Sequence, residues 1–305
     1  MKYTKSFETR SYEIDRHDAL TPTALVQYLQ ETADHQMHDT DKDYGLIYRE
    51  ERKAFVVSRM SVEIMRPIYK YAHVDCDTWV VPAKAANFPR AYELYLEGNL
   101  VARAYSNWAL VDVDTRKLVL QSEYDMSSYP EDREPEMGIP TRFRIPKTME
   151  WNDGGTVPVT LTLTDINGHM NNARYYNCLY DCIPNVEEYC ITSLNMRFVH
   201  EAPLGSELKI LRSDFLDPGK MDPRADKIVY FKTEANGEDN VHAAVLFFMK
   251  KGGRKYVFWW FLLKSGVKWF KMEHILNYSR DVYENLGRQL CSRELMKILL
   301  TIKIE

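Results

Sequence analysis

The sequence has no long apolar run and no apolar stretch near its start. Its densest apolar run, residues 256–263, lies between Lys255 and Lys264 and is too short to span a bilayer, which takes about 20 apolar residues. The first ten residues, MKYTKSFETR, lack the apolar core of a secretory signal. We therefore expect no membrane partner and a cytoplasmic location.

Cysteine is scarce and odd in number. The five cysteines, Cys76, Cys178, Cys182, Cys190 and Cys291, have no framework spacing, so we expect a reducing compartment and no disulfide scaffold. Cys178 and Cys182 lie four residues apart on a predicted helix, but a zinc site needs two further ligands. We read both as small buried apolar side chains and expect neither a metal nor a cofactor.

A strong charge of one sign is also absent. The formal net charge is -4, and 28% charged with 45% apolar residues is ordinary usage for a folded protein. Such mild acidity gives no general attraction to nucleic acid or to an anionic membrane, so neither is an expected partner.

The first half of the chain has the pattern of one helix followed by a run of strands. A length of 305 residues favours two domains, because a single core rarely grows that large. After a strand at residues 2–14, Thr21 is the expected N-cap and Pro22 the first helical residue. Strands follow at residues 55–65, 74–81, 90–97 and 100–112. Since parallel strands would each need a crossover helix, this order predicts an α+β fold with an antiparallel sheet packed on the helix.

The second half repeats this order. A strand at residues 157–164 and a helix at about 171–182 precede strands at residues 191–199, 207–215, 227–234 and 241–249. We divide the chain into a first domain at 1–120, a proline-rich linker at 121–155, a second domain at 156–250 and an extension at 251–305. The extension does not fit the repeat, and we assign it no function.

The repeat has a defined register. Asp15 and Asp165 lie 150 positions apart and precede matching helix starts, whereas Val62 and Leu194 lie 132 positions apart in matching strands. A longer polar loop after the first helix accounts for the difference of 18 residues, since longer loops cost little additional free energy to close. Two similar halves predict one sheet that continues across both.

Polar residues gather between the strand and the helix of the second half. The segment 163–176, LTDINGHMNNARYY, places Asp165, Asn167 and His169 at alternate positions, so their side chains point the same way if the backbone is extended. They would then line a cleft at a helix N-terminus, where N–H groups and the helix dipole polarise a carbonyl. Glu201, in RFVHEAPLG, follows a strand that should flank this helix.

Structural explanations compete with a catalytic one. Asp and Asn often bond their own backbone before a helix, so the segment also fits a turn with a helix cap. A calcium loop fails, because Met170 stands where glycine is needed and Tyr176 where glutamate is needed. For Glu201, the alternative is a solvated side chain at a strand end.

Comparison of the two repeats helps to distinguish an active site from a helix-capping turn. At the repeat offsets three of these residues fall on unrelated ones: Asn167 on His17, His169 on Ala19 and Glu201 on Tyr69. Capping residues would be needed about equally in both halves. A set confined to one half instead indicates a single active site in a duplicated fold.

Several segments match a known family over roughly residues 1–250. In the first half they are RSYEI, LQETA, VSRMSVE, DTWV, SNWALVD and TRKLV. In the second half they are the D-x-N-x-H-x-N-N segment at residues 165–172 and the sequence His200-Glu201-Ala202. On these segments the chain resembles the acyl-acyl carrier protein thioesterases of fatty acid synthesis.

This resemblance implies a fold, a reaction and a set of site residues. The family's fold is two tandem hotdog domains, each a long helix wrapped by a mainly antiparallel sheet. Its catalytic residues carry over as Asp165, Asn167, His169 and Glu201. The implied reaction hydrolyses the thioester of acyl-acyl carrier protein to a free fatty acid and holo-acyl carrier protein, with the acyl chain bound in the first half.

The implied partner is acyl carrier protein carrying an acyl chain. Because that protein is acidic, a local basic surface is expected, and Arg142, Arg144 and Lys147 of the linker are one candidate, with a solvated loop as the alternative. A homodimer is also considered, since tandem hotdogs often pair through sheet edges.

The mechanism expected from these residues uses two carboxylates. A backbone N–H near Asn171 holds the thioester oxygen, and Asp165 acts as nucleophile or base. Glu201 and His169 position and deprotonate water, while Asn167 orients Asp165 or His169.

Other activities remain open on the same residues. A hotdog hydrolase for coenzyme A thioesters needs the same chemistry, a hotdog hydratase or dehydratase also pairs Asp with His, and a non-catalytic acyl-binding protein would make the one-sided set accidental. Two features depart from the family: the extension at 251–305, and Ala202, where plant relatives often carry cysteine. If the chain is active, a thiol at that position is dispensable.

Overall fold

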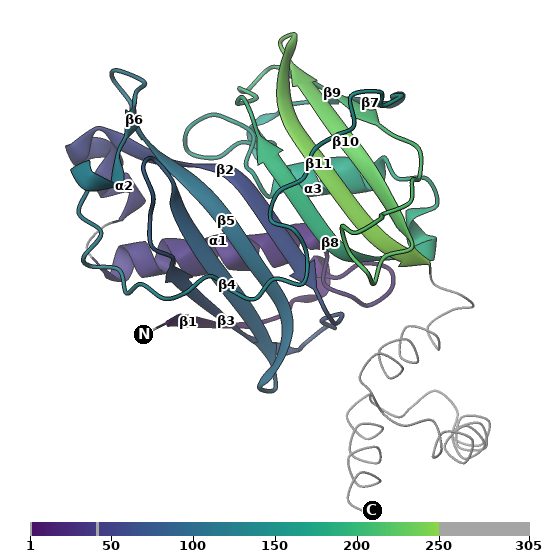
Figure 1. The fold of residues 1–305 in the computed structure, drawn as a ribbon, viewed down its shortest axis with the longest axis horizontal. Coiled ribbons are helices and arrows are strands. Elements are labelled where there is room, and N and C mark those ends of the chain that lie inside the picture. Colours follow the sequence, from purple (N-terminus) through teal and green to yellow (C-terminus); the bar gives the residue numbers. More distant parts are fainter. Residues whose placement is uncertain (1, 41–42, 250–305) are drawn as a thin grey trace, which may run out of the picture. The chain divides into compact units, whose positions relative to one another are not determined.

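Eleven strands form one antiparallel sheet in the part of the chain that the computed structural model describes, residues 2–40 and 43–249 (Figure 1). The first half contributes β1 (Tyr3–Glu8), β2 (Lys53–Ile64), β3 (His73–Val80), β4 (Phe88–Leu96), β5 (Asn99–Asp112) and the short β6 (Leu118–Val119). The second half contributes β7 (Asn152–Pro158), β8 (Tyr189–Phe198), β9 (Glu207–Arg212), β10 (Lys227–Ala235) and β11 (Glu238–Met249). The expectations for residues 251–305 lie outside the described residues.

The strands of the two repeats follow the same order from each outer edge of the sheet to its centre. The full order runs β1-β3-β4-β5-β2-β8-β11-β10-β9-β7, with β6 attached to β5, so each half is an equivalent five-stranded set that meets the other at β2 and β8. Val62 lies directly opposite Leu194, its own repeat equivalent, in that central pair. The offset of 132 and the single continuous sheet are therefore confirmed.

Each half carries one helix against the sheet. The helix α1 (Pro22–Asp39) starts as expected, with the Thr21 hydroxyl accepting a hydrogen bond from the Ala24 N–H at 3.2 Å. Its partner α3 (Arg174–Asp181) has eight residues instead of the twelve expected, because the chain passes through a turn before Arg174. Buried side chains of both helices and both halves of the sheet form one core, which includes Leu29, Val62 and Leu179. This architecture is the tandem hotdog fold.

The first half contains a segment that the second half lacks. After α1, which is ten residues longer than α3, come the one-turn helix α2 (Tyr44–Leu46) and a π-helical turn at Ile47–Glu51. The extra residues thus extend a helix and add two turns, instead of forming the plain polar loop that we expected. Among the described residues, no helix is long and apolar enough to cross a membrane.

The start of the second repeat differs from the expected strand at 157–164. The strand β7 covers Asn152–Pro158 and pairs with β9 through an irregularity between Asp153 and Gly155. This strand could not be predicted from its side-chain pattern, because it contains two adjacent glycines and glycine has little strand preference. Residues 161–163 form a 3-10 turn that matches residues 11–13 at the offset of 150.

Candidate active site

The segment that carries the three alternate polar residues is a tight turn. The Gly168 N–H donates to the Asp165 carbonyl at 3.1 Å, and the Asp165 N–H donates to the His169 carbonyl at 2.9 Å. Gly168 has a φ of 76°, a conformation that costs glycine little. The extended backbone that would align the three side chains is therefore not present, and the segment forms the turn that was the alternative, because Asn and Gly in sequence favour a turn.

The Asp165 carboxylate helps to shape this turn. Its Oδ1 accepts a hydrogen bond from the Asn167 N–H at 2.9 Å. In the first half, Asp15 Oδ1 accepts from the His17 N–H at 2.7 Å, and the turn again has a positive φ at Asp18. This bond belongs to the fold of both repeats, so it is not by itself a sign of catalysis.

His169 and Glu201 form a side-chain pair within the second half. His169 Nε2 lies 3.2 Å from Glu201 Oε2, and the two side chains are 33% and 60% exposed. The turn that carries Glu201 is joined to the turn that carries His169 by two backbone bonds, Met170 N–H to the Ala202 carbonyl at 2.8 Å and Leu204 N–H to the Gly168 carbonyl at 2.9 Å. The backbone therefore fixes the approach of the two side chains.

The residue of the first half that corresponds to Glu201 is Pro67, not Tyr69 as the fixed offset predicted. The bridge between His169 and Pro203 matches the bridge between Ala19 and Tyr69, so Tyr69 is the counterpart of Pro203 and Glu201 falls on Pro67. The turn after β8 is two residues longer than the turn after β2, which a fixed offset cannot detect. The first half still has no carboxylate at this place.

The buried residue Asn240 is hydrogen-bonded to Val199 and His200, the two residues that precede Glu201 in the chain. The carbonyl of Asn240 accepts from the Val199 N–H at 2.9 Å, and its Nδ2 donates to the His200 carbonyl at 2.6 Å. Its Oδ1 accepts from the Thr233 hydroxyl at 2.9 Å. With its polar atoms bonded, Asn240 anchors the backbone that leads to Glu201.

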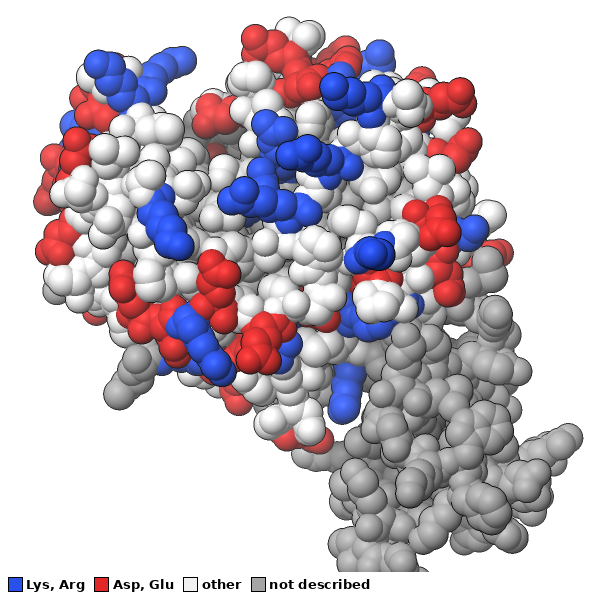
Figure 2. Space-filling view, viewed as in Figure 1, with Lys and Arg blue, Asp and Glu red and all other residues white. Residues whose placement is uncertain are grey.

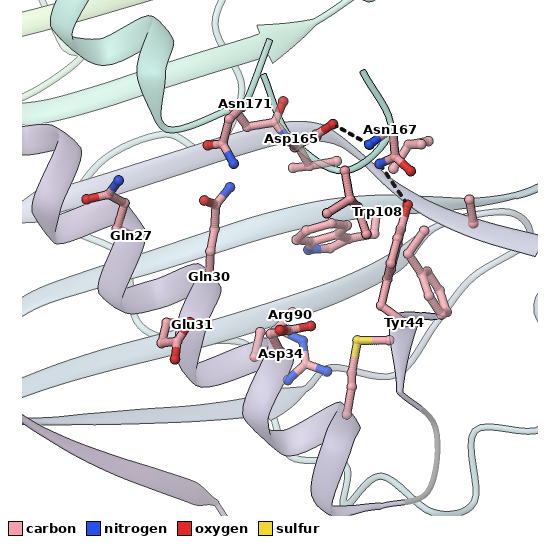
Figure 3. Close-up of a pocket in the computed structure, with 18 of the residues that line it drawn as sticks. Gln27, Gln30, Glu31, Asp34, Tyr44, Arg90, Trp108, Asp165, Asn167 and Asn171 are labelled. Atoms are coloured by element: carbon pink, nitrogen blue, oxygen red, sulfur yellow. Dashed lines mark hydrogen bonds between the residues drawn. The ribbon is translucent and has the colours of Figure 1, made fainter. Parts of the chain in front are cut away.

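Asn167 reaches across to the first half of the chain. Its Nδ2 donates to the Tyr44 hydroxyl at 3.1 Å (Figure 3). In the described residues its side chain is bonded neither to Asp165 nor to His169, so the expected orienting contact is not present. Burial raises the pKa of Tyr44, the bond from Asn167 lowers it, and the negative charges of Asp165 and Glu201 raise it further.

All four predicted residues line one open groove of about 2080 Å³ that runs between the two halves beside α1. Figure 3 shows the Asp165–Asn167 turn above Trp108, with Gln27 and Gln30 of α1 facing the same space. Further into the first half the groove is lined by Met37, Phe55, Phe88 and Trp108, among other side chains. The groove therefore joins a polar site to an apolar region.

The start of α3 supplies a backbone donor at a position other than the expected one. The Asn171 N–H is already bonded to the Leu163 carbonyl at 2.9 Å, and the Ala173 N–H to Asn171 Oδ1 at 2.9 Å. The N–H of Asn172, between them, has no hydrogen-bond partner among the described residues. Asn172 is the better candidate for holding an oxyanion.

Cys178 of α3 and Cys182, which directly follows the helix, are partly exposed, whereas we expected both to be buried. Cys182 Sγ donates to the carbonyls of Gly154, at 3.1 Å, and Cys178, at 3.0 Å. Burial raises the pKa of Cys178 to about 11 and also raises that of Cys182.

Two family models match the chain. Residues 1–127 match the acyl-ACP thioesterase N-terminal domain, and residues 154–248 match the acyl-ACP thioesterase C-terminal domain. The two matches together cover well over half of the chain and leave most of the linker between them.

Curated relatives are plant thioesterases. Oleoyl-acyl carrier protein thioesterase 2, chloroplastic, of Arabidopsis thaliana is 28% identical over 203 residues, which are 60% of this chain and 54% of the relative. Palmitoyl-acyl carrier protein thioesterase, chloroplastic, of Gossypium hirsutum is 24% identical over 227 residues, which are 68% of this chain and 54% of the relative. The chain spans about half the length of the curated relatives it matches.

Solved structures share the fold. An acyl-ACP thioesterase from Bacteroides thetaiotaomicron has a TM-score of 0.65 at 23% identity, covering 80% of this chain and 96% of that one. The 12:0-ACP thioesterase from Umbellularia californica has a TM-score of 0.69 at 17% identity, covering 82% and 98%.

Proposed function

Because this chain belongs to the acyl-ACP thioesterase family, we propose that it hydrolyses the thioester of acyl-acyl carrier protein in fatty acid biosynthesis, releasing a free fatty acid and holo-acyl carrier protein. The supporting observation is the His169–Glu201 pair at 3.2 Å, which shares one groove with Asp165 and has no counterpart in the first repeat.

The proposed mechanism places the thioester carbonyl below the Asp165–Asn167 turn. The Asn172 N–H receives the carbonyl oxygen as charge develops on it. One oxygen of Asp165 is held by the turn, and its other oxygen either attacks the carbonyl carbon or takes a proton from water. Glu201 and His169, which are in contact at 3.2 Å, bind the attacking water beside their pair. They take up its proton, directly or through Asp165, and pass it to the sulfur as the thioester C–S bond breaks and the free thiol leaves.

The two halves have different roles in this proposal. Residues 156–250 carry the catalytic groups, and residues 1–120 bind the acyl chain in the apolar region near Phe88 and Trp108. A cytoplasmic location and a homodimer stay predictions, and the names of the plant relatives place those proteins in the chloroplast.

Substrate choice is tested by comparing acyl-acyl carrier protein with acyl-coenzyme A of the same saturated chain. We expect release of free thiol from both, with a higher kcat/KM for the carrier protein substrate. A higher kcat/KM for acyl-coenzyme A would assign the chain to coenzyme A thioesters instead. Absence of thiol release from either saturated substrate would contradict hydrolysis and favour a hydratase or a binding protein.

Tyr44 is proposed to position Asn167 from the segment that only the first half has. Replacing Tyr44 with Phe removes one neutral hydrogen bond, so kcat should fall by roughly 2- to 10-fold. The melting temperature should change little, because Asn167 is exposed and its amide finds water. The matched control is Tyr48→Phe, in the same segment and also lining the groove, which should keep the wild-type kcat. Equal kcat values for wild type and Tyr44→Phe would remove the positioning role.

A further inference from the structure

Two arginines face each other at the centre of the sheet. Arg59 of β2 lies directly opposite Arg197 of β8 in the pair that joins the halves. Their neighbours Met60 and Met196 belong to the core on the helix side. Because side chains alternate along a strand, both arginines lie on the other face, where the Ser61 hydroxyl contacts the Thr141 carbonyl of the linker.

A third arginine joins them from the linker. Burial lowers the pKa of Arg59, and the positive charges of Arg142 and Arg197 lower it further. Arg142 and Arg197 are exposed. Figure 2 shows a group of basic side chains in the middle of this face, over the region where β2 and β8 meet.

These charges are not balanced within the described part of the chain. No ion pair there involves Arg59, Arg142 or Arg197. By contrast, Lys232 of β10, which lies in the same cross-strand row of residues as Arg59 and Arg197, pairs with Asp239 at 2.7 Å. Like charges directly opposite each other destabilise a sheet. Binding of an anionic partner would therefore stabilise this arginine pair at the centre of the sheet.

The arginine pair lies next to residues that line the groove, although neither arginine is part of that lining. Arg59 and Arg197 form the last pair of the β2–β8 ladder, and beyond them the strands separate. The adjacent residues Ser58 and Phe198 line the groove, as does Glu201 three residues further on. A partner on the three arginines would therefore sit beside the entrance to the site.

We propose that Arg59, Arg142 and Arg197 form the docking surface for the acidic carrier protein that delivers the acyl chain. The inference rests on the proposed function, and it places carboxylates of the carrier on guanidinium groups that can bind them through two hydrogen bonds each. From there the thioester arm enters the groove between the separated ends of β2 and β8. Of the linker residues expected to serve this role, the surface uses Arg142.

The test uses charge reversal that the fold can tolerate. Arg197→Glu places an acidic side chain opposite Arg59, which removes the like-charge pair and should leave the melting temperature equal or higher. Combined with Arg142→Glu, it should raise KM for acyl-acyl carrier protein by about 5- to 30-fold with little change in kcat. The control Arg66→Glu makes the same charge change as Arg197→Glu alone, half that of the double variant, at an exposed arginine just beyond the other end of β2.

A small substrate separates this inference from the proposed function. Hydrolysis of an acyl-N-acetylcysteamine thioester, which carries no protein, should be the same in the wild type and in the double variant. Equal KM values for acyl-acyl carrier protein in the double variant and in Arg66→Glu would overturn the docking surface while leaving the activity in place. Lack of wild-type hydrolysis of either substrate would instead reject the proposed function.

Discussion

Replacing Asp165 with Asn lowers kcat toward acyl-acyl carrier protein by about 10²- to 10⁴-fold, the usual contribution of a positioned acid or base. The substitution keeps an oxygen that can accept the bond from the Asn167 N–H, so the turn persists while the carboxylate is lost. The measurement is steady-state release of free thiol, together with the melting temperature, which should stay within a few degrees of the wild type.

The first repeat provides a control for this substitution. Asp15 makes the same bond to its turn, at 2.7 Å, but it does not line the groove, and Ala19 and Pro67 stand where the second half has His169 and Glu201. Asp15→Asn should therefore keep the wild-type kcat. A wild-type kcat in Asp165→Asn would show that Asp165 only shapes its turn, as Asp15 does.

Glu201→Gln is expected to lower kcat by a similar factor, about 10²- to 10⁴-fold, because the amide cannot take a proton from water. Stability should be nearly unchanged, since the side chain is 60% exposed and exposed ion pairs contribute little. Thermal unfolding and thiol release measured on the same preparation check both statements.

Glu207→Gln is the matched control for this second substitution. Glu207 is an exposed residue at the start of β9 and does not line the groove. The control should retain wild-type kcat and KM. If Glu201→Gln and Glu207→Gln have the same activity, the water is activated elsewhere and the role of Glu201 is lost.

Much of the fold was predictable because it is repeated. The strands after each helix alternate apolar and polar side chains and end at turn residues, so their order followed from the sequence, and of these strands only the two-residue β6 was missed. The N-cap at Thr21 and the proline after it fixed the start of α1. The opposition of Val62 and Leu194 follows directly from two equivalent halves that meet edge to edge.

The parts that were mispredicted depend on backbone conformation. Gly154 and Gly155 form part of β7 although they have no side-chain pattern, and the Asp165–Gly168 turn has a hydrogen bond pattern that alternation of residue types cannot reveal. Likewise, two extra residues after β8 shift the counterpart of Glu201 from Tyr69 to Pro67.

One member of the candidate site was missed entirely. Tyr44 is 123 positions away from Asn167, and no local pattern links them. The only signal in the sequence was the extra length of the first half after its helix. The structure shows that part of this extra length contacts the site of the other half.

The most direct test of the account is thiol release from a saturated acyl-acyl carrier protein by the wild type and by the double variant Asp165→Asn/Glu201→Gln. We predict rapid release by the wild type and a rate at the uncatalysed background for the folded double variant. Release at the wild-type rate by the double variant would contradict an active site formed by the second half.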